Sequence, residues 1–346
     1  MTRMQQAHVQ STAGFYDEWL GLWEKNEEEK KRARKAIQPE ELEWVRTRQD
    51  AKAALLVSPQ TGFRSSGTVT MIAEIPPGWH TGKHSHGEEA LYILDGEKGF
   101  SIVNNQRYDW EKGACMRIPF GAVHQHFNTG SNPVKYYSAM APYLESLALV
   151  AKFEQFEDCG VTTAIPTASV NQSHPDHDDK GRRILLHAKD APVTIGGENL
   201  KSSPKTAFSE SHPLEMRDGD KEKGHHARSI HLMDSTSDFL SDEVELTNIN
   251  CEAPGTHSGK HAHMEAILYV LQGEGYTIID GEKVPWKPGT CMHIAGPQTV
   301  HQHFNTCNIE SQHLRAHSGI RARFFQPIAK EKFPYLYFET RGKNIP

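Results

Sequence analysis

The sequence predicts an all-β protein that contains two copies of one small barrel or sandwich domain, preceded by a helical arm. The main observation is an internal repeat: residues 78–96 read GWHTGKHSHGEEALYILDG, and residues 255–273 read GTHSGKHAHMEAILYVLQG, 177 positions later. A second match joins residues 108–130 to residues 284–306 with only one-residue gaps. Two copies this similar indicate two domains of one fold.

Each copy reads as a series of short β-strands. The runs TVTMIAEI, ALYILDG and CMRIP are rich in β-branched and aromatic residues and are interrupted by Gly, Pro and Asn. This pattern is typical of antiparallel strands joined by tight turns. No segment within a copy is long enough for a crossover helix, so a sandwich or a barrel is favoured over a parallel sheet.

The segments outside the repeat define the remaining domain boundaries. Residues 1–52 are predicted to form the helical arm, with one or two helices that end or kink near Pro39. We expect the arm to pack on the first barrel or on a second subunit, which favours a homo-oligomer. The first barrel is assigned to residues 53–150, a polar linker with local structure to 151–226, and the second barrel to 227–346. The acidic run HPDHDD at 174–179 is interpreted as a solvated surface.

Composition excludes several classes of function. The net charge of −6 leaves no basic surplus for nucleic acid or anionic membranes. No apolar run approaches the roughly 20 residues of a membrane span, and the N-terminus lacks signal-peptide features. The 5 cysteines form no CxxC pair, which predicts reduced thiols in a cytoplasmic protein, with Cys115 and Cys291 buried. The 21 histidines are the unusual feature.

Three histidines in each copy have the spacing of metal ligands. Alternate residues of a strand point the same way, so His84 and His86 project from one face, as do His261 and His263. A third imidazole comes from further along each copy, from His124 and from His301 respectively. Three neutral imidazoles suit Fe, Mn, Ni, Cu or Zn, so one divalent ion per domain is predicted.

These segments resemble the cupin family. Residues 113–128, GACMRIPFGAVHQHFN, contain the complete second cupin motif, and residues 78–86, GWHTGKHSH, begin the first. Gly289, His301 and Asn305 repeat the second motif with a one-residue insertion. The resemblance covers about residues 60–145 and 235–325 and implies two cupin barrels of the double-stranded β-helix, or jelly-roll, type.

The sequence leaves the fourth ligand open. Cupins often add a glutamate after the second histidine. Glu89 keeps the family's spacing to Gly96 but lies too close to the histidine pair, and Ala266 takes its place in the second copy. Glu88 and Glu265 do correspond between the copies and share parity with the histidines. Either these two glutamates are ligands, or both sites contain three histidines only.

Six further residues that recur between the copies are candidates for contact with substrate. We interpret the histidines two positions after the last ligand as acid–base groups, and the others as substrate contacts by parity or by strand position. Hydrogen-bonded core histidines and core-packed tyrosines are the alternatives. The acid–base candidates are His126 and His303; the substrate-binding candidates are His80, Tyr92, His257 and Tyr269.

In plan the chain is similar to the bicupin ring-cleaving dioxygenases that act on gentisate, salicylate and hydroxynaphthoate. This resemblance implies Fe(II), O2 and a hydroxylated aromatic acid as partners, with His126 close to the substrate. Two departures are visible: Tyr92 stands where that family has a carboxylate-binding arginine, and both copies keep their histidines. The second feature brings the chain nearer to oxalate decarboxylases and quercetin-type dioxygenases.

Three hypotheses follow. The preferred one is an Fe(II) dioxygenase that acts on a small hydroxylated aromatic or other oxygen-rich substrate. The second is a decarboxylase or isomerase that depends on Mn or Ni, and Zn is a further possible metal. The third is a non-catalytic metal-binding barrel.

Overall fold

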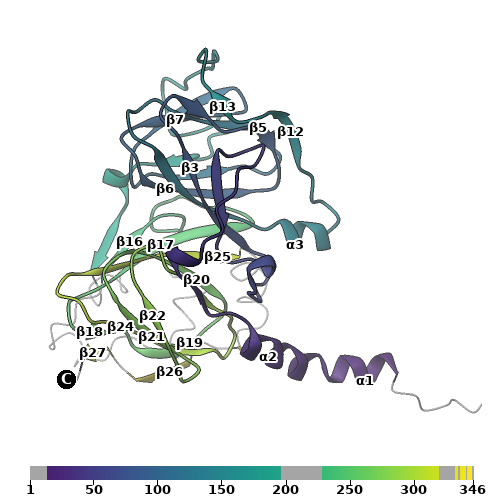
Figure 1. Cartoon of the computed structure of the whole chain (residues 1–346), viewed down its shortest axis with the longest axis vertical. Coiled ribbons are helices and arrows are strands. Elements are labelled where there is room, and N and C mark those ends of the chain that lie inside the picture. The colour runs from purple at the N-terminus through teal and green to yellow at the C-terminus, as the bar shows by residue number, and fades with distance from the viewer. Residues whose placement is uncertain (1–13, 196–227, 319–331, 334–335, 340, 345–346) are drawn as a thin grey trace, which may run out of the picture. The chain divides into compact units, whose positions relative to one another are not determined.

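The computed structural model describes residues 14–195, 228–318, 332–333, 336–339 and 341–344. The chain divides into two compact units, residues 1–33 and residues 34–346. The first unit contains the predicted helices, α1 (Phe15–Leu20) and α2 (Leu22–Arg32) (Figure 1). Basic residues fill the last turn of α2, where they interact favourably with the helix dipole. None of the described helices is long and apolar enough to cross a membrane.

The first barrel consists of two antiparallel sheets. Its inner sheet has the strand order β14-β9-β6-β11-β3-β2. Its outer sheet has the order β12-β5-β10-β4-β13, with β7 paired to β10 and β8 paired to β7. A short helix, α3 (Pro142–Leu147), follows β11. The strands are β2 (Lys52–Leu55), β3 (Val69–Ile75), β4 (Trp79–His80), β5 (Lys83–Ser85), β6 (Glu89–Asp95), β7 (Gly99–Val103), β8 (Gln106–Trp110), β9 (Cys115–Ile118), β10 (His124–Asn128), β11 (Val134–Met140), β12 (Glu154–Glu157), β13 (Gly160–Val161) and β14 (Leu185–Leu186).

The second barrel repeats this plan. Its inner sheet has the order β1-β23-β20-β25-β17-β16-β15, and its outer sheet contains β22-β21-β24-β18-β27 with β19 and β26. The two-barrel, all-β prediction is therefore confirmed. The strands are β1 (Ala36–Ile37), β15 (Val193–Ile195), β16 (Arg228–His231), β17 (Val244–Glu252), β18 (Thr256–His257), β19 (Lys260–Ala262), β20 (Ala266–Gln272), β21 (Gly275–Ile279), β22 (Glu282–Trp286), β23 (Cys291–Ile294), β24 (Val300–Asn305), β25 (Ser311–Ser318), β26 (Leu336–Glu339) and β27 (Gly342–Lys343).

The barrels exchange one strand with each other. Strand β1, which precedes the first barrel in sequence, pairs with β23 of the second, and Ile37 lies opposite Cys291. Strand β14 precedes the second barrel but pairs with β9 of the first, and Leu186 lies opposite Cys115. The two pairings are equivalent, so residues assigned from sequence to the arm and the linker belong to the barrels. Residues 196–226 of the predicted linker lie outside the described residues.

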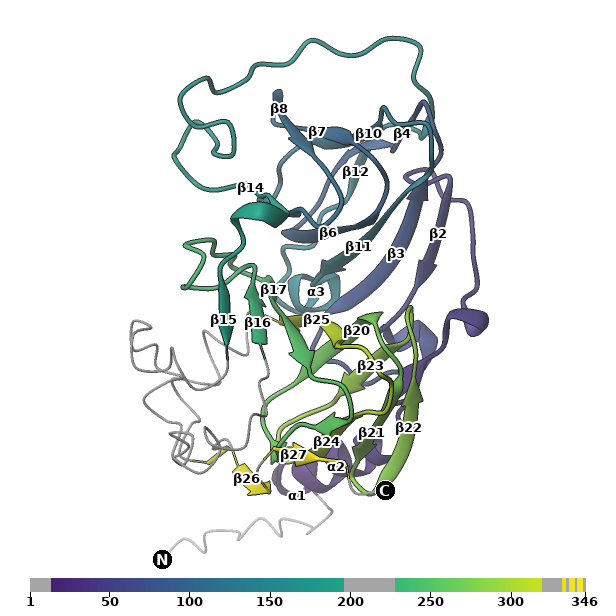
Figure 2. The same cartoon turned by 90° about the vertical axis from the view of Figure 1, so that its left-hand side faces the viewer.

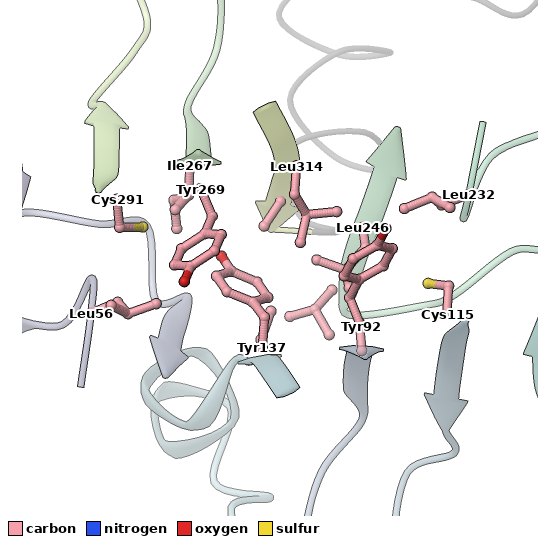
Figure 3. Close-up of a cluster of buried hydrophobic side chains, with 14 of the residues drawn as sticks. Leu56, Tyr92, Cys115, Tyr137, Leu232, Leu246, Ile267, Tyr269, Cys291 and Leu314 are labelled. Atoms are coloured by element: carbon pink, nitrogen blue, oxygen red, sulfur yellow. The ribbon is translucent and has the colours of Figure 1, made fainter. Parts of the chain in front are cut away.

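The inner sheets of the two barrels share one hydrophobic core. Figure 2 shows β3, β6 and β11 of the first barrel facing β17, β20 and β25 of the second. Side chains from both sheets interlock there, and the Tyr137 and Tyr269 rings lie 5.4 Å apart (Figure 3). Cys115 and Cys291 are buried in this core as free thiols, as expected from the sequence. The shared core therefore makes the barrels one packing unit.

The exchanged strand gives a modest stability prediction. Ile37 is 2% exposed and lies in the shared core, so Ile37→Val removes one buried methyl group. We expect a loss of about 0.5–1.5 kcal/mol in the free energy of unfolding, measured by urea denaturation. Ile309→Val, at a side chain that is 48% exposed, is the control and should change the free energy by less than about 0.5 kcal/mol. Equal effects would show that β1 contributes nothing to the core.

Candidate metal centres

The first histidine triad is assembled by neighbouring strands of the outer sheet. Strands β5 and β10 are paired with His84 opposite His124, and His86 directly follows β5. The His84 ring centroid lies 4.1 Å from that of His124 and 5.0 Å from that of His86. All three side chains are buried, and one nitrogen of each lies within 4.8 Å of the others. The predicted triad is therefore brought together.

Backbone carbonyl groups orient the three rings. Each Nδ1 lies 2.9 Å from a carbonyl oxygen, contributed by Gly82 for His84, Gly87 for His86 and Ala122 for His124. This assigns the proton to Nδ1 and leaves the Nε2 lone pairs facing inward, where they have no hydrogen-bond partner among the described residues. Burial lowers the pKa of His84 to about 2 and that of His86 to about 4. The His84 and His86 imidazoles are thus neutral, as metal ligation requires.

A fourth candidate ligand in this centre is Glu89, which the sequence analysis set aside. One carboxylate oxygen of Glu89 lies 3.5 Å from His86 Nε2 and 3.4 Å from His124 Nε2, and the other accepts a hydrogen bond from Ser138. Burial alone would raise the pKa of Glu89, but the His124 and His86 imidazoles hold it below its ordinary value. The spacing from Glu89 to Gly96 was the signal that could have identified it.

Glu88 and Glu265, one of the two alternatives that the sequence left open for a fourth ligand, are engaged elsewhere. The strand is interrupted after β5 and resumes at Glu89, so counting alternate residues from His86 to Glu88 fails. Glu88 Oε1 lies 2.5 Å from Arg117 Nε, and Glu88 Oε2 accepts the amide hydrogens of Asp242 and Glu243 in the second barrel. The assignment of Glu88 as a ligand is therefore corrected to an interdomain contact.

Glu265 occupies the equivalent position in the second barrel and makes the equivalent contact. It lies 2.7 Å from His293 Nε2 and accepts hydrogen bonds from the backbone and side chain of Ser66 in the first barrel. His293 stands opposite Ile267 on β20, as Arg117 stands opposite Ala90 on β6. Glu265 is thus also corrected from ligand to interdomain contact. We call Glu88 and Glu265 the latch glutamates.

The second histidine triad has the same arrangement as the first. His261 lies opposite His301 on β24, with ring centroids 4.3 Å apart, and the His263 centroid lies 4.7 Å from that of His301. Backbone carbonyl oxygens again face each Nδ1. Ala266 replaces Glu89, and Arg315 Nη2 lies 3.3 Å from His263 Nε2. Burial lowers the pKa of His301 to about 4.

The predicted acid–base histidines lie beside the triads. His126 Nδ1 is 2.6 Å from Ser101 Oγ, which also accepts a hydrogen bond from Trp110. Its Nε2 is buried without a hydrogen-bond partner among the described residues, and one nitrogen of the ring lies within 4.8 Å of ligand atoms of Glu89 and His124. In the second barrel His303 Nδ1 is 2.8 Å from Thr277 Oγ1. Burial lowers the pKa of His126 to about 3, so its imidazole is neutral in the folded protein.

The other two recurring histidines face away from the triads. His80 Nδ1 is 2.9 Å from the side-chain amide of Gln125, and Gln125 alternates along β10 with the inward-facing His124 and His126. His257 makes the equivalent contact with Gln302, at 3.0 Å. The assignment of His80 and His257 to substrate binding is therefore corrected. The extended strand is interrupted between β4 and β5, so the alternation of inward and outward side chains is again lost there.

Tyr92 and Tyr269 also point away from the centres. Both lie in the shared core between the inner sheets, as Figure 3 shows, because β6 and β20 turn alternate residues toward the neighbouring barrel. Burial raises the pKa of both hydroxyl groups above the ordinary tyrosine value. Their assignment as substrate contacts is corrected to core packing, the alternative considered from sequence.

A buried Asp–Tyr pair beside the first centre was not predicted. The Tyr136 hydroxyl donates a hydrogen bond to Asp50 Oδ1 at 2.5 Å, and the Tyr136 ring centroid lies 5.8 Å from that of His126. Burial raises the pKa of Asp50 to about 7, against the opposing effect of the Tyr136 hydrogen bond. Asp50 comes from the segment assigned to the arm, so only the folded contact reveals it.

The donor set of each centre fits a divalent transition metal. Neutral imidazoles held by carbonyl groups, with buried inward lone pairs, are the ligands that such ions prefer. The first centre adds one carboxylate and the second adds none among the described residues. The two centres therefore share three ligands and differ in charge.

The fold and these sites define the class of protein. The cupin domain model matches residues 71–140 and 251–309, one stretch in each barrel. Each half of the chain is thus a cupin domain with a histidine triad, and the protein is a bicupin. No curated protein matches the chain significantly in sequence.

Solved structures of bicupin enzymes are similar to this chain in fold. Salicylate 1,2-dioxygenase from Pseudoaminobacter salicylatoxidans, as a point mutant in complex with gentisate, aligns with a TM-score of 0.60 at 14% identity, and 98% of each chain is covered. The same enzyme in another structure gives 0.55 at 15% identity, over 82% of this chain and 80% of that one. A mutant of Bacillus subtilis oxalate decarboxylase gives 0.56 at 11% identity, over 82% and 77%. At these identities the likeness shows the fold.

Proposed function

We propose that this bicupin is a non-haem Fe(II) dioxygenase that acts on a small hydroxylated aromatic acid. The observation that carries the proposal is the convergence of three buried imidazoles whose Nε2 atoms face one point. A bound Fe(II) would supply Lewis acidity and a path for electrons between substrate and O2. The fold likeness to salicylate 1,2-dioxygenase is compatible with this reaction class as an analogy of fold.

The residues around the first centre suit a substrate with a hydroxyl group. Burial makes His126 a weak base, so we infer that its neutral imidazole, beside Glu89 and His124, exchanges a hydrogen bond with the substrate oxygen. Ser101 fixes its ring through Nδ1. The substrate, O2 and the metal are the partners that this function requires.

A second candidate is a Mn-dependent decarboxylase, and one observation favours it. Glu89 adds a carboxylate to the first triad, and a donor set with a carboxylate suits Mn better than imidazoles alone. The fold likeness to oxalate decarboxylase is compatible with this reaction. The two candidates differ in O2 consumption. Ring opening by a dioxygenase consumes O2 in stoichiometric amount, whereas decarboxylation has no net consumption of O2.

The proposal is tested with anaerobically purified protein that is loaded with Fe(II) and mixed with a hydroxylated aromatic acid in the presence of O2. We expect O2 uptake with gentisate or salicylate, and a new ultraviolet absorbance from the ring-opened product. His84→Ala and His261→Ala should each remove one iron per chain, and loss of O2 uptake in one of them identifies the catalytic barrel. CO2 release from oxalate without O2 consumption would favour the decarboxylase. Protein that binds no metal would contradict both.

A further inference from the structure

The inward-facing atoms of the first centre are closed off from solvent. The Nε2 atoms of His84, His86 and His124 are buried, and so are Oε2 of Glu89 and Nε2 of His126. A substrate that is to meet these atoms therefore needs an opening in the wall of the first barrel. Such an opening is expected where the side chain that covers the centre is itself exposed and has few packing partners.

One exposed aromatic ring covers this centre. The centroid of the Phe153 ring lies 5.2 Å from that of His86, and the two planes are inclined by 32°. Phe153 is 57% exposed, whereas His86 is 2% exposed. Among the described residues, the other rings that contact the histidines of the centre belong to those histidines and to Tyr136, and all of them are buried. Phe153 is thus the ring that separates the centre from solvent at His86.

The segment that carries Phe153 passes over the turn that presents His86. At one end of the segment, Glu145 of α3 lies against Gly87, where a Cβ would meet Oε1 of Glu145 at 1.9 Å. At the other end, Glu154 of β12 pairs with Ser85 of β5, and the two strands are neighbours in Figure 1. Residues 146–154 are all exposed. The backbone is therefore held at both ends, while no packing on the outer side prevents the Phe153 side chain from turning outward.

The approach to Phe153 is apolar. Leu147, Leu149 and Val150 precede it in the same segment and are 82%, 92% and 49% exposed. Exposed apolar side chains next to a buried polar centre suit the ring of an aromatic acid, which has an apolar body and polar oxygens.

We propose that Phe153 is the gate of the first centre: its ring closes the route from solvent to the ligands, and its size limits the aromatic rings that can enter. The limit on ring size rests on the proposed function, and the closure itself rests only on metal binding by the first triad. Phe153 lies in the segment that the sequence analysis assigned to the linker, so its role depends on a contact that only the folded chain shows.

The closure is tested by the kinetics of Co(II) binding to metal-free His261→Ala protein, in which only the first triad is complete. Phe153→Ala should accelerate both Co(II) association and Co(II) release into excess chelator by roughly fivefold or more, because removal of a gate lowers the barrier in both directions. The Kd should therefore stay within about twofold of its value with Phe153 present, and Phe153→Trp should slow both steps. Phe156→Ala, at a ring that is 55% exposed in the same segment, is the matched control and should change neither rate.

Two outcomes of this experiment would overturn the closure. Unchanged rates in Phe153→Ala would show that the ring does not obstruct the route. A Kd that changes as much as the rates would show that the ring supports His86 rather than closing a route. In the His84→Ala background, where only the second triad is complete, Phe153→Ala should change neither rate; an equal acceleration there would also contradict the assignment to the first centre.

The limit on ring size is tested with Fe(II)-loaded protein and O2. Phe153→Ala should raise kcat/KM for a two-ring hydroxy acid about tenfold relative to a one-ring hydroxy acid, and Phe156→Ala should leave this ratio unchanged. An unchanged ratio in Phe153→Ala would refute the selection by size. If no variant takes up O2 with any acid, the dioxygenase proposal fails, whereas the Co(II) rates still decide whether Phe153 is a gate.

Discussion

Replacing Arg117 with methionine should destabilise the protein by about 3–5 kcal/mol, because it leaves Glu88 as a buried charge without its cation. Glu88 is 1% exposed, and its carboxylate joins the Arg117 guanidinium to the backbone of the second barrel. The same guanidinium donates to Asp242 and to the Leu240 carbonyl across the interface. The substitution should therefore weaken the contact between the barrels, and urea denaturation measures the decrease in the free energy of unfolding.

A double variant and a surface pair serve as controls for this prediction. Arg117→Met combined with Glu88→Gln removes the buried charge and should recover part of the lost stability. Lys112→Met breaks the exposed pair with Asp95 on the same barrel and should cost less than about 1 kcal/mol. If Arg117→Met lowers the free energy of unfolding no more than Lys112→Met does, the contacts of Glu88 do not stabilise the interface between the barrels.

The sequence predicted those features that lie within short, repeated segments. The repeat defines two barrels, and the HxH pair with the distant third histidine defines each triad, because strand pairing places His84 opposite His124 and His261 opposite His301. The HxH pair follows from the alternation of side chains along one strand. The third histidine of each triad comes from a distant segment, and the repeat together with the second cupin motif identified it.

Parity failed wherever a strand was interrupted. The strand ends at Ser85, bends at Gly87 and resumes at Glu89, so Glu89 rather than Glu88 faces the triad. Gly87 lies against the buried carboxylate of Glu145, where a Cβ would meet an oxygen at 1.9 Å. A one-residue bend of this kind moves every later side chain to the other face. The alternation of residue types in the sequence gives no sign of this bend.

Contacts between segments far apart in sequence were beyond prediction. Tyr92 looks like a cavity residue until the second barrel is known to cover its face of the sheet. Asp50 reaches the first centre from the segment assigned to the arm, and Arg315 reaches the second from β25. Duplication also disguised the difference between the centres, because the ligands repeat while the residues beside them do not.

Asp50→Asn should remove a pH dependence of stability that the buried carboxyl group creates in the metal-free protein. Burial, and then the charge of Glu89, raise the pKa of Asp50 from 3.8 to about 7, although the Tyr136 hydrogen bond opposes the shift. Between these values the folded chain keeps a proton that the unfolded chain has released, so stability falls as pH rises. The stabilisation is complete below the unfolded pKa and is lost as pH passes the folded one.

The free energy of unfolding should change by about 1.4 kcal/mol for each pH unit between the unfolded and the folded pKa of Asp50. Asparagine keeps an acceptor for the Tyr136 hydroxyl and carries no titrating proton, so the variant should gain about 3 kcal/mol on wild type between pH 5 and pH 7. Urea denaturation at each pH measures the gain, with Asp109→Asn at an exposed carboxylate as control. A dication in the first triad favours the Asp50 carboxylate, so metal should reduce the gain. Parallel stability curves for Asp50→Asn and wild type would mean that the Asp50 carboxyl group does not keep its proton in this pH range.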